Sequence, residues 1–250
     1  MKYSHIAACA LVAALSAAAS AAPVTFSGTS GNRSASASFS VTGTTLTVKL
    51  TNTSLSDALV PTDILTGLFF NSSSPFGSLG DAMLGAGTTV LHSPSGLVNG
   101  TIGGNGDVGG EWAFRDDLAG AGQGNANFGI SSSGLGLFGA DDRFDISFNL
   151  QGPESPDGLQ YGLTTAGDNG GTGNSPVTGD FALIQNQVVF TFAVASTFDP
   201  STAISNIWFQ YGTDLNEPSF GPDNPIPLPS TAMMAVAGLG LIGIRRRRTA

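Results

Sequence analysis

The sequence predicts an all-β fold: a β-sandwich or jelly-roll-like single domain with long glycine-rich loops. Several short stretches alternate apolar and polar residues with period two, which is typical of strands with one buried face. Clusters of Gly, Asn, Ser and Pro divide these stretches, as turns and loops do. Glycine supplies 35 of the 250 residues, about twice the average usage. Apart from a weak pattern at Asp116–Ala121, no window has the apolar period of an amphipathic helix.

The expected strands follow in chain order. Ser34–Val41 alternates Ser and Ala around Phe39, and Thr44–Leu50 alternates Leu and Val with Thr and Lys. The break at Gly43 predicts a hairpin of half-buried strands. Arg143–Leu150 has the cleanest alternation in the chain. Further strands are expected at Ile64–Phe70, Thr88–Leu91, Gln187–Ala195 and Ile204–Tyr211.

Residues 1–21 have the pattern of an export signal. A short polar front precedes the alanine-rich apolar run Ile6–Ala19, and small residues at Ala19 and Ala21 fit the cleavage positions. We expect the Sec translocon to export the chain and signal peptidase to cut after Ala21. Because Cys9 is the single cysteine, the mature protein cannot form an internal disulfide.

Residues 223–250 have the pattern of a membrane-spanning end. The run Ser230–Ile244 carries no charge, and as a helix it covers roughly 22 Å of the roughly 30 Å bilayer core. Adding Ile226–Pro229 brings it close to spanning length. A stop-transfer signal of four arginines follows: Arg245, Arg246, Arg247 and Arg248. We expect these arginines on the cytoplasmic side of the membrane, which leaves the body outside. The alternative is a buried C-terminal helix of the body.

This tripartite end resembles the PEP-CTERM sorting signal of exosortase-dependent bacterial surface proteins. The matching features are the proline-spaced entry, the apolar segment Ala237–Ile244 and the arginine end. The proline-spaced motif comprises Pro225, Pro227, Leu228 and Pro229, with Leu228 where the family has glutamate. Leu228–Ala232 also looks like the LPxT-type signal of Gram-positive sortases, which is the alternative.

The resemblance implies a temporary anchor that a membrane processing enzyme of the exosortase type removes. The protein is then the substrate of that reaction and not its catalyst. We expect it to be exported, held briefly in the inner membrane, and then placed at the cell surface or outside the cell.

The body, residues 22–222, is acidic and long enough to bury a real core. Its basic residues are only Arg33, Lys49, Arg115 and Arg143, which argues against nucleic acid and anionic lipid as partners. Glycine-rich blocks at 97–139 and 152–179 look similar to PEP-CTERM surface proteins of undefined activity. That resemblance implies a non-enzymatic role linked to exopolysaccharide or biofilm matrix, with no catalytic residues to transfer.

Catalytic and metal chemistry has few candidates in the body. His92 is its one histidine, no Gly-x-Ser-x-Gly elbow is present, and a zinc site of His and Cys is excluded. The carboxylates Asp116, Asp117, Asp141, Asp142 and Asp145 could form a glycosidase pair or hold Ca²⁺, the one cofactor considered. We interpret them as turn residues, since Asp is common in turns. A secreted glycan-active hydrolase that uses Asp and Glu is the alternative function.

Aromatic residues suggest where a glycan could bind, because aromatic rings stack on apolar faces of sugars. Trp112 and Tyr161 lie in glycine-rich stretches and are the candidate glycan platform, with core packing as the alternative. Trp208 lies within an apolar strand, where alternation predicts a core position.

Overall fold

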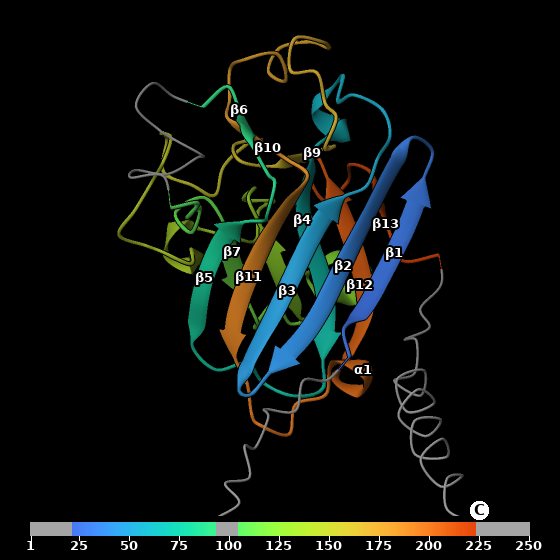
Figure 1. Ribbon diagram of the computed structural model, residues 1–250, viewed down its shortest axis with the longest axis vertical. Helices are drawn as coiled ribbons and strands as arrows, with labels where there is room; N and C mark the ends of the chain where they lie inside the picture. Colours follow the sequence, from blue (N-terminus) through green and yellow to red (C-terminus); the bar gives the residue numbers. More distant parts are fainter. Residues whose placement is uncertain (1–21, 94–104, 224–250) are drawn as a thin grey trace, which may run out of the picture.

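The computed structural model describes residues 22–93 and 105–223, which form two β-sheets packed face to face (Figure 1). The first sheet, sheet A, has the order β1-β2-β3-β11-β5 and is antiparallel throughout. Its strands are β1 (Val24–Ser30), β2 (Arg33–Thr42), β3 (Thr45–Asn52), β11 (Gln187–Ala193) and β5 (Leu79–Leu84). The sequence-based prediction of an all-β fold is confirmed.

The second sheet, sheet B, has the order β13-β12-β4-β9-β10-β6, and β8 and β7 are attached beside β4. Only the pair β9 and β10 is parallel among the pairs of this sheet in the described residues. Its strands are β4 (Leu65–Ser72), β6 (Val90–Leu91), β7 (Ala113–Arg115), β8 (Phe128–Ser131), β9 (Leu163–Thr164), β10 (Leu183–Gln185), β12 (Ile204–Tyr211) and β13 (Ser219–Phe220). The helices in the described segments are short: α1 (Pro200–Ala203) and 3₁₀ turns at Pro61–Asp63, Gln123–Asn125 and Ala140–Asp142.

The predicted hairpin is β2 and β3. Thr42 pairs with Thr45 across the turn, and Gly43 adopts a φ of 62°, a conformation that glycine reaches without strain. The predicted strands near Ile64, Gln187 and Ile204 are confirmed as β4, β11 and β12, and the one at Thr88–Leu91 is shortened to β6. The weak helical pattern at Asp116–Ala121 is wrong, since those residues form a bend and a turn.

The predicted strand Arg143–Leu150 is also wrong. The chain there wraps around the guanidinium group of Arg143, which donates to the carbonyl oxygens of Ala140 (2.7 Å), Phe148 (2.8 Å) and Ile146 (2.9 Å). A strand would use these carbonyls in a ladder with a neighbouring strand. Apolar residues do alternate in this segment, but the backbone carbonyl oxygens that a strand would need accept hydrogen bonds from the buried Arg143.

Phenylalanine rings fill the space between the sheets. Phe39 of sheet A meets Phe70 of sheet B edge to face, with ring centroids 5.6 Å apart. Phe76, in the loop after β4, lies at the centre of the cluster, 5.0 Å from Phe192 and 5.8 Å from Phe114 between ring centroids. Such pairs add about 0.5–1.5 kcal/mol each beyond the burial of their apolar area. The loop that carries Phe76 is thereby part of the core.

We expect Phe76→Ala to lower the free energy of unfolding by about 3–5 kcal/mol, because it removes a buried ring and leaves a cavity that several neighbours line. Chemical denaturation followed by circular dichroism measures the change. Ile146→Ala is the matched control, since Ile146 is 61% exposed and its truncation should cost less than about 0.5 kcal/mol. Equal effects of the two substitutions would contradict a core role for Phe76.

Candidate functional site

The outward side of sheet A carries a regular array of hydroxyl groups. Except at Ser30, Arg33 and Asn52 near the strand ends, the inward positions of β1, β2 and β3 are apolar and buried. The alternate positions face outward and are exposed or half-buried. From Thr25 to Thr51 these outward positions are Ser or Thr, with Lys49 as the exception: Thr25, Ser27, Thr29, Ser34, Ser36, Ser38, Ser40, Thr42, Thr45, Thr47 and Thr51. We call this surface the hydroxyl face.

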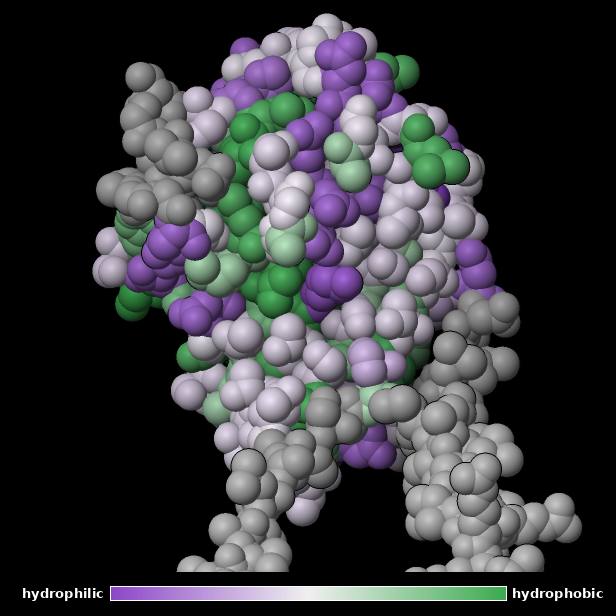
Figure 2. Space-filling model, viewed as in Figure 1, coloured by the Kyte–Doolittle hydropathy of each residue, from purple (hydrophilic) through white to green (hydrophobic). Residues whose placement is uncertain are grey.

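The array follows from strand geometry and register. Outward residues of one strand repeat at about 6.8 Å, and neighbouring strands lie about 4.8 Å apart. The register places hydroxyl residues opposite each other, as in Ser27 with Ser36 and Ser40 with Thr47. Figure 2 shows the surface over these strands as largely pale, the colour of intermediate hydropathy. The hydroxyl face therefore offers many short donors and acceptors and almost no charge.

Part of this hydrogen-bonding capacity is unused. Thr25 donates to Ser38 at 3.1 Å between oxygens. The side chains of Ser36, Ser40 and Thr47 make no hydrogen bond to any residue in the two described segments. Their hydroxyl groups are available to an external ligand or to water.

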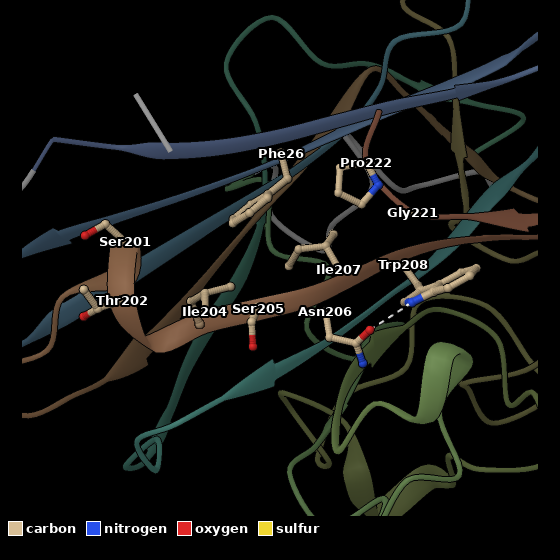
Figure 3. A pocket seen from close by; sticks show the side chains of 10 residues that line it. All are labelled: Phe26, Ser201, Thr202, Ile204, Ser205, Asn206, Ile207, Trp208, Gly221 and Pro222. Atoms are coloured by element: carbon tan, nitrogen blue, oxygen red, sulfur yellow. Dashed lines mark hydrogen bonds between the residues drawn. The ribbon is translucent and has the colours of Figure 1, made fainter. Parts of the chain in front are cut away.

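A groove lies at one edge of the sandwich, between β1 of sheet A and β12 of sheet B. We call it the edge groove; it encloses about 540 Å³, and its lining contains no charged residue. Phe26 and Ile207 point toward each other, with Pro222 beside them (Figure 3). Along the rim, the indole N–H of Trp208 donates to the side-chain oxygen of Asn206 at 3.1 Å.

A β-bulge shapes the rim of the edge groove. The register between β12 and β4 shifts between Ser205 and Trp208, and Asn206 has a φ of 53°, which Asn tolerates better than most residues. Ser205 and Asn206 are consequently both exposed although they are adjacent in the strand. Trp208, which alternation places in the core, is only half-buried for the same reason.

The candidate glycan platform of Trp112 and Tyr161 is wrong, because both side chains are completely buried. Trp112 packs edge to face on Phe190, with centroids 5.1 Å apart. The glycines before Trp112 permit close backbone approach and do not mark exposure. A Cβ on Gly110 would lie 2.0 Å from the carbonyl oxygen of Phe148.

The carboxylates considered for catalysis or calcium hold turns and loops. Asp117 pairs with Arg115 at 2.8 Å, Asp142 accepts from the backbone N–H of Gly139 at 2.7 Å, and Asp145 accepts from Ser147. Asp116 and Asp141 are exposed. Within the part of the chain that the structure describes, no group of three His, Cys, Asp or Glu residues is placed to hold a metal ion.

A second groove, of about 360 Å³, lies between the end of β3 and the turn that joins β10 to β11. Its lining is mostly hydroxyl and amide side chains, among them Thr51, Thr165 and Asn186, together with Leu55, and it contains no carboxylate. Neither groove therefore offers the pair of carboxylates that glycoside hydrolysis uses.

Glu111 is the acidic residue that sequence reasoning missed. It is completely buried, and its carboxylate accepts from the backbone N–H groups of Leu150 (2.6 Å) and Gln151 (2.9 Å) and from the Ser155 hydroxyl. Burial raises the pKa of Glu111 from 4.5 to about 7, although these hydrogen bonds oppose the rise. Burial together with this carboxyl also raises the pKa of Tyr161. The sequence signal that could have revealed Glu111 is the position of an acidic residue beside the apolar residues around Trp112.

Several predicted residues lie outside the described part of the chain. These are the signal-cleavage residues Ala19 and Ala21, the motif Pro225, Pro227, Leu228 and Pro229, and the stop-transfer residues Arg245, Arg246, Arg247 and Arg248. Among the described residues, no helix combines the length and apolar character needed to span a bilayer.

Comparisons with models of known protein families, with curated proteins and with solved structures find no match to this chain.

Glu111 makes stability depend on pH in a defined direction. Its carboxyl keeps the proton up to about pH 7 in the folded protein but loses it near pH 4.3 in the unfolded chain. The contribution to stability is thus fully present below the unfolded pKa and is lost as pH rises through 7. We expect the free energy of unfolding to fall by roughly 3 kcal/mol across this window on account of Glu111.

Glu111→Gln keeps the acceptor for the N–H groups of Leu150 and Gln151 and removes the titration. The difference in unfolding free energy between wild type and variant, measured by denaturation at pH 4.5 and 7.5, should therefore shift in favour of the variant at the higher pH. Asp141→Asn, at an exposed position, is the control and should leave the slope unchanged. A wild-type slope that survives in Glu111→Gln would refute the assignment.

Proposed function

We propose that this protein is an exported surface or extracellular-matrix protein that binds neutral polysaccharide through the hydroxyl face and has no enzymatic role. The observation that carries the proposal is the outward array of Ser and Thr on β1, β2 and β3, interrupted only by Lys49. Polysaccharide chains present hydroxyl groups along their length, and Ser and Thr hydroxyls both donate and accept.

The energetics favour a wide contact of weak interactions. One hydrogen bond that replaces two bonds to water contributes about 0.5–1.5 kcal/mol. A long polymer can engage many positions at once, so that its overall affinity far exceeds that of one sugar. The short side chains of Ser and Thr, fixed on a sheet, lose little conformational freedom on binding.

A hydrolase is the less favoured alternative. Asp117, Asp142 and Asp145 are engaged in local contacts, and the two grooves are lined by no carboxylate. Glu111 has the raised pKa that a general acid needs, but it is completely buried, so that no sugar can reach it.

We also propose that residues 22–222 form one exported sandwich domain, and that a membrane enzyme of the exosortase type removes the end of the chain. The described strands begin at Val24 and end at Phe220, so both expected processing points fall outside them. One hydrophobic cluster includes residues of both sheets, from Val24 to Phe220, as expected for a single domain. Removal of either end takes away no described strand.

Binding of the purified protein to an insoluble neutral polysaccharide, such as cellulose, tests the role of the hydroxyl face. We expect the double variant Ser36→Glu and Thr47→Glu to weaken co-sedimentation about tenfold or more, a loss of about 1.4 kcal/mol, because it places two charges in the uncharged array. Thr178→Glu, at an exposed loop position outside sheet A, should bind like wild type. Equal binding by wild type and double variant, or none by either, would overturn the proposed role of the hydroxyl face.

Mass spectrometry of both ends of the protein recovered from the cell surface tests the sorting proposal. We expect an N-terminus at Ala22 and a new C-terminus between Pro227 and Thr231. A cut between Thr231 and Ala232 would favour the LPxT-type sortase. Recovery of the intact chain through Ala250 would exclude removal of the tail by either enzyme.

A further inference from the structure

The last described residues set the course of the chain as it leaves the sandwich. After β13, the backbone N–H of Asp223 donates to the carbonyl oxygen of Ser27 at 3.0 Å, and Thr29 donates to the Asp223 carboxylate at 2.8 Å. Gly221 passes very close to Gly28: a Cβ atom on Gly28 would lie 2.4 Å from the carbonyl oxygen of Gly221. The chain therefore runs along the outer edge of β1, in the opposite direction.

This course leads along the edge groove. Gly221 and Pro222 already form part of its lining, and Phe26, the residue before Ser27, is next along β1. In the described residues, β13 pairs with β12 only at Phe209 and Gln210. The first half of β12, Ile204–Trp208, thus pairs with β4 on one side and, on the side of the groove, with no strand of the described residues.

The sequence that follows is suited to a groove and not to a sheet. In an extended chain, the N–H groups of alternate residues point to the same side. If the chain continued in this way along β1, positions 225, 227 and 229 would be the ones to face it after Asp223. All three are proline and have no N–H to donate, which prevents the segment from extending sheet A. Asn224, Ile226 and Leu228 precede these prolines and are restricted to extended backbone.

The segment and the groove also match in chemical character. Asn224–Ser230 carries no charge and presents Ile226, Leu228 and three prolines. The groove lining is uncharged and offers the rings of Phe26 and Trp208 together with two isoleucines. Extended proline-rich segments bind aromatic-lined grooves at low entropic cost, because their backbone is already ordered. At about 3.1 Å per residue, seven residues reach about 22 Å.

We propose that the edge groove is the binding site of the chain's own proline-spaced segment, Asn224–Ser230. The segment begins two residues after Pro222, which lines the groove, so its effective concentration at the groove is high without any external partner. Docking holds the expected processing point against the sandwich, and the processing enzyme must displace it before cutting. This consequence rests on the proposed sorting function, whereas the docking itself does not.

Disulfide cross-linking of the full-length chain in detergent micelles tests the docking. Cys9→Ser removes the native thiol, and Ser205→Cys in the groove is combined with Ile226→Cys or Leu228→Cys in the segment. A disulfide requires Cα atoms within about 7 Å. The matched control replaces Ser205→Cys with Thr178→Cys, an exposed position away from the groove.

We expect an intramolecular cross-link from Ser205→Cys that forms at least about tenfold faster than from Thr178→Cys and does not depend on protein concentration. Equal rates from the two positions would overturn the proposal. A cross-linked dimer in place of the intramolecular product would overturn it in favour of a second copy as the occupant. Since no processing enzyme is present, the result is independent of the sorting proposal.

As a second measurement, Ile226→Asp together with Leu228→Asp introduces charge into the segment without altering any described residue. We expect faster hydrogen exchange at Ile204–Trp208 in this variant than in wild type, with unchanged exchange in the hairpin of β2 and β3. Identical exchange at Ile204–Trp208 in both proteins would contradict docking.

Discussion

Packing of phenylalanine rings between the two sheets is the interaction on which the rest of the structure depends. Phe39 and Phe70 join the sheets directly, and Phe76 contributes a ring from a loop to the same cluster. Burial of this kind is the main favourable contribution to folding. It requires each strand of sheet A to turn one side inward, and the other side is thereby left for the hydroxyl groups.

The long connections between strands need partners for their backbone groups, because buried N–H and C=O groups are costly when unpaired. Two buried polar side chains, Arg143 and Glu111, supply many of these partners. Arg143 donates to four carbonyl oxygens, and Glu111 accepts from two N–H groups of the same loop region. A chain with long glycine-rich loops can therefore order them with a few polar side chains in place of sheet ladders.

Local alternation was enough to predict the hairpin of β2 and β3, since its register and its turn both depend on adjacent residues. It failed at Arg143–Leu150, where the carbonyl groups of Ile146 and Phe148 bind a guanidinium and Arg143 alone forms a β-bridge, to Ala113. It also misplaced the two tryptophans, since it predicted Trp208 in the core and Trp112 at the surface. A bulge at Asn206 brings Trp208 to the rim of a groove, and close backbone approach buries Trp112. Those outcomes depend on contacts between distant parts of the chain, which periodicity does not report.

The edge groove could not be predicted for a related reason, since β1, α1, β12 and the residues after β13 each supply part of it. The strand β1 connects this groove to the hydroxyl face. Thr25 and Ser27 point outward into the array, while Phe26 between them points into the groove (Figure 3). Because successive side chains of a strand face opposite sides, the two surfaces share a backbone but no side chain of β1. A ligand on the hydroxyl face and a segment in the groove can therefore be bound at the same time. Thr29 is the exception that connects them, since it belongs to the hydroxyl face and donates to Asp223, which leads into the segment.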